Sequence, residues 1–218
     1  MKKTLTIAAV ALFAMLVLTT LSCGKLDVVG NDSMRAFGDL LQNSPQLVSQ
    51  DNEGGGWSFT APDNSARFIW SHSNAMLEFD AAPFIAAGLD PSKLPDAFSF
   101  RSGMLATGTK LGNGQSSPSG ETTPLAAYQQ IVKLNRSAIG YHSAMDHYGV
   151  YLGGGNLFEW AKNLTTNDKD IVFVLDPEPF IKAGVDPAKI EGWAFAKVPV
   201  EDKNGMMIVD KILKPFDL

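Results

Sequence analysis

The sequence is short of cysteine and histidine, and these shortages exclude several kinds of site. Cys23 is the one cysteine among 218 residues, so the chain has no internal disulfide and no cysteine cluster for zinc. The three histidines are His72, His142 and His147. A phosphate-binding loop is missing as well. The glycine runs at 54–56 and 153–155 lack both a following Lys-Ser/Thr and a strand-to-helix G-x-G-x-x-G pattern, so they predict turns.

Basic residues are too few for a nucleic-acid partner. The chain has 18 Lys+Arg against 23 Asp+Glu. The first 22 residues hold Lys2, Lys3 and no acid, so the remainder carries 16 basic and 23 acidic residues, a formal charge of −7. This charge argues against binding nucleic acid and against adhesion to anionic lipid. The composition is otherwise globular, with 45% hydrophobic residues, and the part after the first 22 residues is long enough for one core.

The N-terminus is the most apolar part of the chain. "MKK" is followed by "TLTIAAVALFAMLVLTTL", and Ser22 then precedes Cys23. Such a stretch is either a transmembrane anchor or the apolar region of a cleaved secretion signal with a small residue before the cut. A cysteine directly after the apolar run favours the cleaved signal.

The segment "SCGK" at 22–25 resembles the lipobox of bacterial lipoproteins. Thr20 stands where most boxes have leucine, which is similar to the relaxed boxes of spirochaetes. The resemblance implies that residues 1–22 are a lipoprotein signal peptide and that Cys23 is lipidated and becomes the mature N-terminus. A protein anchored in this way sits on a membrane of the cell envelope. Gly24 resembles the residue that sorts such proteins to the outer rather than the inner membrane in proteobacteria.

A short tether and a helix are predicted to follow the lipid. Residues 23–32 predict the tether, and residues 33–43 predict a helix with Ser33 as its N-cap, which Pro45 cannot continue. One face of this helix is apolar: Met34, Phe37 and Leu41. That face either docks on the domain or lies on the membrane. Docking is favoured, because the polar face lacks the lysines and arginines of a membrane-surface helix.

Two segments of the chain repeat each other. Asp80–Leu94 and Asp176–Ile190 are identical at nine of fifteen positions, where average residue usage predicts about one. The similarity extends to flanking hairpins that turn at "PDNS" and "GGGN", and to glycine turns before Met104 and Met206. The sequence therefore predicts an internal duplication.

Each copy of the repeat predicts two helical turns joined at a glycine. Gly88 and Gly184 stand where a left-handed residue ends the first turn, and prolines occupy only first-turn positions. Four acids precede these turns: Asp80, Asp90, Asp176 and Asp186. Capping of backbone N–H groups explains all four. The alternative, that they are acid/base groups or cation ligands, is the weaker hypothesis.

The predicted fold is α+β, with mostly antiparallel sheet and short helices in one compact domain over 33–218. Its two pseudo-equivalent halves cover about 49–111 and 138–218. A flexible polar loop at 112–123 and a helix at 124–135 join them.

The densest polar cluster is "YHSAMDHYG" at 141–149, which invites a metal or catalytic interpretation. In an extended segment His142 and His147 face opposite sides, and in a helix they also diverge. Met145 and His147 are soft ligands for copper(I), but two are too few. Ser143 lacks the context of a nucleophile elbow. We therefore expect no catalytic residue, no metal and no cofactor.

The sequence predicts a non-enzymatic lipoprotein that acts by binding. Four tryptophans and thirteen phenylalanines suffice for a core, and some of them alternatively line a groove. The preferred hypothesis is a lipid or other apolar small molecule held between the two halves. One alternative is a subunit that docks an envelope protein or a glycan. The other, less favoured, is a hydrolase or metal site at 141–149.

Overall fold

The computed structural model describes residues 28–51, 56–71, 74–110, 123–164, 170–202 and 205–218. The signal peptide at 1–22, Cys23, the first half of the tether and nearly all of the loop at 112–123 lie outside the described residues. Within the described ranges, no helix is both long and apolar enough to cross a bilayer.

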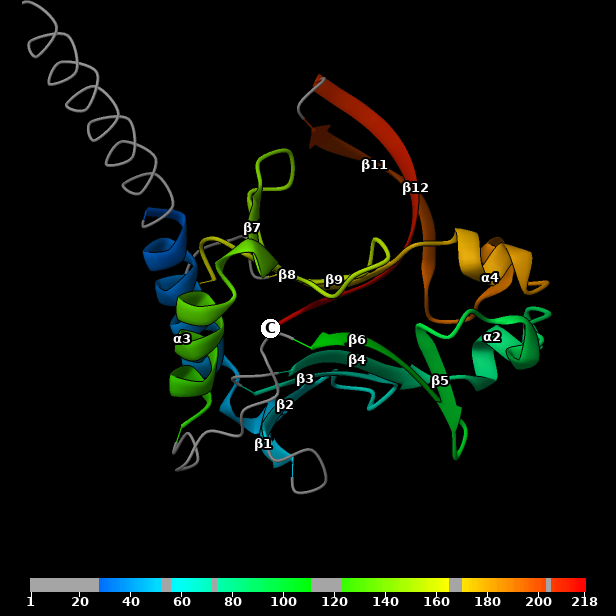
Figure 1. Cartoon of the computed structure of the whole chain (residues 1–218), viewed down its shortest axis with the longest axis horizontal. Helices are drawn as coiled ribbons and strands as arrows, with labels where there is room; N and C mark the ends of the chain where they lie inside the picture. Colours follow the sequence, from blue (N-terminus) through cyan, green and yellow to red (C-terminus); the bar gives the residue numbers. More distant parts are fainter. Residues whose placement is uncertain (1–27, 52–55, 72–73, 111–122, 165–169, 203–204) are drawn as a thin grey trace, which may run out of the picture.

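Two six-stranded antiparallel sheets form the molecule, and they share one strand order (Figure 1). The first sheet runs β1-β2-β3-β4-β6-β5: β1 (Val48–Asp51), β2 (Gly56–Thr60), β3 (Ala66–Trp70), β4 (Asn74–Asp80), β6 (Met104–Lys110) and β5 (Phe98–Arg101). The second runs β7-β8-β9-β10-β12-β11: β7 (Ile139–His142), β8 (His147–Tyr151), β9 (Leu157–Ala161), β10 (Asp170–Leu175), β12 (Gly205–Asp217) and β11 (Ala194–Asp202).

The helices also occur in the same order in both halves. A helix over 28–43 and η1 (Pro45–Leu47) precede the first sheet, and α3 (Pro124–Leu134) and η3 (Arg136–Ala138) precede the second. Each sheet is interrupted after its fourth strand by a short helix and a 3₁₀ turn: α2 (Ala82–Ala86) with η2 (Pro91–Lys93), and α4 (Glu178–Lys182) with η4 (Pro187–Lys189). The predicted α+β fold with two similar halves is confirmed, while their origin by duplication stays a prediction.

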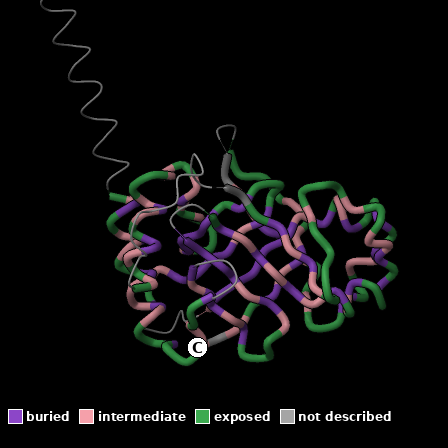
Figure 2. Tube along the Cα trace, turned by 60° about the horizontal axis from the view of Figure 1, so that its bottom comes forward, coloured by how far each residue is buried: buried purple, intermediate pink, exposed green. Residues whose placement is uncertain are grey.

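A layer of aromatic rings fills the space between the two sheets. Phe68 and Phe158 stack there at 4.4 Å between ring centroids. At one end Phe37 of the 28–43 helix stacks on Tyr128 of α3 at 4.0 Å, so the predicted docking of that helix is confirmed. At the other end Phe84 lies 5.1 Å from Phe180. The buried segments form one continuous core (Figure 2).

The start of the first helix differs from the prediction. Residues 28–32, assigned to the tether, are already helical, and Ser33 lies inside the helix rather than at its N-cap. Ser33 is fully buried; its hydroxyl donates to the Gly30 carbonyl at 3.0 Å and accepts from the Tyr128 hydroxyl at 3.1 Å. The cap prediction is wrong because the serine joins the two helices instead of ending one.

The acids of the repeat lie at the beginnings of helical turns, as predicted. Asp90 accepts from the Ser92 N–H at 3.1 Å, and Asp186 accepts from the Ala188 N–H at 3.2 Å. Asp80 and Asp176 likewise accept an N–H two residues on, although the N-cap is one residue later in each case. These carboxylates therefore shape the backbone.

Candidate functional site

The second sheet carries side chains that its counterpart lacks. The strand registers pair Ile69 with Met76 and Glu159 with Val172, so Glu159 takes the place that Ile69 has in the first half. By the same comparison His147 corresponds to Gly56, and its cross-strand partner His142 corresponds to Asp51. The first sheet has the same strand order with an apolar residue and a glycine at two of these positions and an aspartate at the third. The combination of two histidines and a glutamate is thus specific to the second half among the described residues.

The strands of the final hairpin are also longer than their counterparts. β11 and β12 have 9 and 13 residues, whereas β5 and β6 have 4 and 7. β12 pairs with β10 only over residues 212–217, so residues 196–202 and 205–211 form a two-stranded ribbon beyond the sheet, here called the arm. Figure 1 shows the arm curving away from the first half.

The arm returns to the opposite edge of its own sheet. His142 Nε2 on the edge strand β7 donates to the Pro199 carbonyl oxygen on the other edge strand, β11, at 2.8 Å. This hydrogen bond joins the two edges, so the second sheet curls around the face that points away from the first sheet.

A cavity of about 690 Å³ lies inside this curl. Its wall is mainly aliphatic: Leu157, Val172, Val174, Val198, Val200, Val209, Leu213 and Pro215. His142, Glu159, Asp170 and Lys211 supply the polar part, and Tyr141, Ser143, Met145 and Tyr151 also contribute. A large apolar hollow with a few convergent polar groups is typical of a small-molecule site.

Two histidines share one buried carboxylate in the wall of this cavity. His142 Nδ1 lies 3.4 Å from Glu159 Oε1, and His147 Nδ1 lies 3.7 Å from Glu159 Oε2. The second distance is too long for a hydrogen bond, and His147 Nδ1 has no hydrogen-bond partner among the described residues. His147 Nε2 lies 3.0 Å from Asp170 Oδ2. The side chains of His147 and Glu159 are only 2% and 6% exposed.

The prediction that His142 and His147 face apart is wrong. It assumed one continuous strand or helix, whereas residues 143–146 form a tight turn and the two histidines are direct cross-strand partners. Asp146 adopts a left-handed conformation, with φ of 54°, inside that turn. Glu159 and Asp170 were missed altogether. A charged residue inside the apolar strand "LFEWA" is the signal that points to Glu159, because buried carboxylates need partners.

The cluster stabilises charge in a poorly solvated place. Hydrogen bonding by Glu159 raises the pKa of His142 despite partial burial. Burial lowers the pKa of His147, but the carboxylates of Glu159 and Asp170 outweigh it and the pKa is raised. Burial likewise opposes ionisation of Glu159, yet the two histidines hold its pKa below the usual range. Imidazolium and carboxylate therefore stabilise each other near neutral pH.

The described residues include no group of three or more His, Cys, Asp or Glu side chains placed to hold a metal ion. Both ring nitrogens of His142 are engaged, one with Glu159 and one with Pro199, so neither is directed at Ser143. What the arrangement supplies is a cavity wall with a fixed pair of opposite charges.

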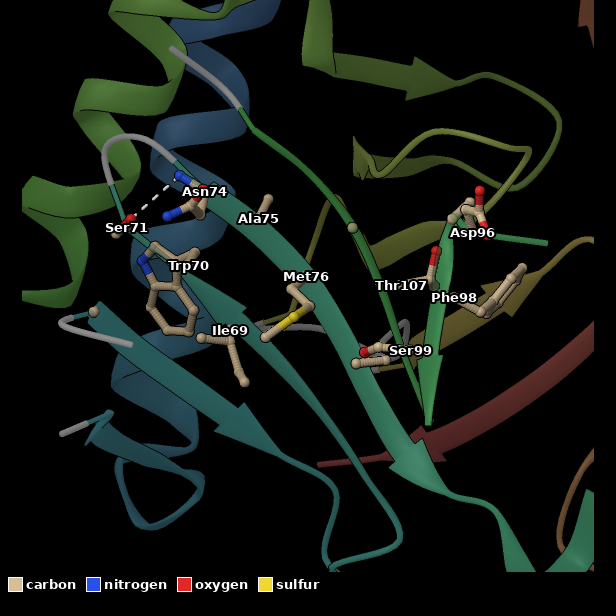
Figure 3. A pocket seen from close by; sticks show the side chains of 14 residues that line it. Ile69, Trp70, Ser71, Asn74, Ala75, Met76, Asp96, Phe98, Ser99 and Thr107 are labelled. Atoms are coloured by element: carbon tan, nitrogen blue, oxygen red, sulfur yellow. Dashed lines mark hydrogen bonds between the residues drawn. The ribbon is translucent and has the colours of Figure 1, made fainter. Parts of the chain in front are cut away.

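The first sheet has a smaller hollow in a related place, with a volume of about 340 Å³ (Figure 3). Ile69, Met76 and Phe98 line it, together with Ser71, whose hydroxyl accepts from the Asn74 N–H at 3.2 Å. Among the described residues that line it, Asp96 is the one acidic side chain and none is a histidine. Within the described part of the chain, the larger cavity and its charge cluster lie in the second half.

Comparisons with protein-family models, with curated proteins and with solved structures find no match to this chain.

Proposed function

We propose that this protein is a non-catalytic binding protein, anchored in the bacterial envelope through Cys23, which holds an apolar ligand such as a lipid chain in the 690 Å³ cavity. The observation that carries the proposal is that two distinctive features of the second half lie at one cavity. The charge cluster and the long arm are two departures of the described second half from the first, and both border the cavity of about 690 Å³.

The placement of the ligand differs from the hypothesis of a site between the halves. The interface between the sheets is occupied by packed rings such as Phe68 and Phe158, which are fully buried. The cavity inside the curl of the second sheet has the room and the aliphatic wall that a lipid chain needs, and each methylene buried there contributes about 0.8 kcal/mol.

A filled-cavity variant tests the proposal. Val209 lines the cavity from the arm, whereas its neighbour Ile208 points to the other side and is 61% exposed. Val209→Trp places a bulky ring inside the hollow, and Ile208→Trp adds the same ring outside it. We expect native mass spectrometry to detect a co-purifying lipid, and a fluorescent fatty-acid probe to bind the wild type and Ile208→Trp but not Val209→Trp. Absence of both lipid and probe from the wild type contradicts the proposal, as does equal binding by all three proteins.

Docking of an envelope protein is a second candidate function. The side of the arm away from the cavity exposes Met206 at 57% and Ile208 at 61%. Exposed apolar groups that lie together favour a partner. Crosslinking through the arm in intact cells should then capture one specific protein, and Ile208→Asp should abolish that capture without changing binding of the fatty-acid probe.

A further inference from the structure

We propose that His142 is a proton-controlled latch, which holds the arm over the cavity while the imidazole is charged and releases it when the proton is lost. The role of the latch in ligand entry rests on the proposed function, whereas the latch itself is a property of the protein without ligand.

The geometry favours a charged imidazole. Pro199 presents a carbonyl oxygen and Glu159 a carboxylate oxygen, and both of these groups only accept hydrogen bonds at neutral pH. A doubly protonated ring of His142 donates from Nε2 to Pro199 and directs its Nδ1–H at Glu159. A neutral ring has one N–H, so one of its nitrogens then presents a lone pair to an oxygen. Loss of the proton thus weakens either the bond to the arm or the contact that orients the ring.

Among the described residues, the arm has few other connections. Ile212 and Leu213 at its base are paired on both sides, by β10 and β11, but residues 205–211 pair with β11 alone. Lys211, at the base, donates to the Gly155 carbonyl at 3.0 Å. Pro199 lies further out, opposite Ile208. A hydrogen bond to Pro199, which lies far from the base of the arm, therefore strongly restricts the position of the arm.

The groups around His142 leave its own imidazole as the group whose titration operates the latch. Glu159 faces it from β9, His147 is beside it on β8, and Asp170 on β10 reaches it through His147. Glu159 has a lowered pKa and stays ionised across the neutral and alkaline range, so it does not titrate with the latch. Because the pKa of His142 is raised, the contribution of its charged imidazole to holding the arm is full at low pH. That contribution is lost as the pH rises through the raised pKa.

The described residues of the first half form no equivalent device. Asp51 stands at the position of His142, and β5 and β6 are too short to return across their sheet. The fold does not need the latch, which is consistent with a role in controlling access to the second-half cavity.

Hydrogen exchange of the full chain in detergent tests the latch without any ligand. Protection factors, corrected for the intrinsic pH dependence of exchange, are measured by mass spectrometry at pH 6 and pH 9 for peptides from the arm and from β9. In the wild type we expect arm protection to fall about tenfold at pH 9, the scale of one charge-assisted hydrogen bond. The β9 peptides should stay protected.

Two variants isolate His142 from the other titrating groups. His142→Ala should leave the arm weakly protected at both pH values. His142→Gln keeps a side-chain N–H for Pro199 but does not titrate, so arm protection should no longer depend on pH. Lys197→Ala, which removes an exposed ion pair of the arm with Asp210, should keep the wild-type pH response.

The outcomes separate the latch from the proposed function. Arm protection that is independent of pH in the wild type overturns the latch, and so does a pH response that persists in His142→Gln. The wild-type profile and the His142→Gln variant together decide between these outcomes. The test therefore still holds if His142→Ala fails to fold. If the arm opens at pH 9 but no fatty-acid probe binds at either pH, the latch stands and the proposed function fails.

Discussion

Gly88 and Gly184 face each other so closely that a Cβ atom on Gly88 would lie 2.6 Å from the carbonyl oxygen of Gly184. The reverse distance is 2.8 Å. On either side of them, the Asp90 N–H donates to the Ala183 carbonyl and the Asp186 N–H donates to the Ala87 carbonyl, both at 2.9 Å. The two repeated segments are therefore bonded to each other reciprocally, which explains why both copies need glycine at the same point.

Substitution of Gly88 tests this contact. Gly88→Ala strains a residue whose φ is +109° and also forces the two backbones apart. Gly103→Ala is the matched control, because Gly103 has a φ of +82° but nothing within 4 Å of the added Cβ. We expect a loss of about 1 kcal/mol in the free energy of unfolding for Gly103→Ala and about 3 kcal/mol or more for Gly88→Ala. Urea denaturation measures both, and equal losses contradict the contact.

The glycines, prolines and aspartates of the repeat were predictable because each serves its own local backbone. Gly88 ends a helical turn whatever the rest of the chain does. The charge cluster was not predictable in this way. The turn that pairs His142 with His147 lacks glycine and depends on an aspartate in the left-handed region. Contact between His142 and Pro199, 57 residues apart, depends on the curl of the whole sheet.

Removal of the Glu159 charge should lower the pKa of both histidines. In Glu159→Gln the buried imidazoles lose the carboxylate that stabilises their charged forms, so NMR titration should find both pKa values below those of the wild type. Breaking a buried ion pair costs about 3 kcal/mol. That loss should be full at pH 6 and smaller at pH 9, because the wild-type contribution disappears as the pH rises through the raised histidine pKa values. A loss of the same size at both pH values contradicts this account.

A salt bridge between the halves should give stability that acid removes. Lys214 on β12 donates to Asp63 in the β2–β3 turn at 2.7 Å, and its side chain is only 9% exposed. Burial opposes ionisation of Asp63, but hydrogen bonds from Lys214 and Ser65 outweigh it and lower its pKa to about 2. The contribution of this ion pair to the free energy of unfolding is therefore present above pH 3.8, the ordinary pKa of an aspartate. It is lost as the pH falls toward 2.

Asp63→Asn should lower the free energy of unfolding by about 1 kcal/mol at pH 7, because it removes the carboxylate that compensates the buried Lys214 ammonium and leaves it the Gly192 carbonyl at 3.4 Å, while solvent screens the exposed Asp63 carboxylate. Asp210→Asn, which removes the exposed pair with Lys197, should change stability by less than about 0.5 kcal/mol. Urea denaturation at pH 7 and pH 2 compares the two variants. If Asp63→Asn costs as much at pH 2 as at pH 7, the ion pair is not the cause.

The predicted lipid anchor depends on Cys23, which lies outside the described residues. Cys23→Ser removes the thiol that would carry the acyl chains, and one or two chains largely decide whether a soluble domain stays on a membrane. We expect the wild type to fractionate with membranes and to carry a lipid mass on an N-terminal cysteine peptide, and the variant to lose that mass. If the variant keeps residues 1–22 and stays in the membrane fraction, the apolar stretch acts as a transmembrane anchor. If the wild type carries no lipid on Cys23, the lipobox interpretation is wrong.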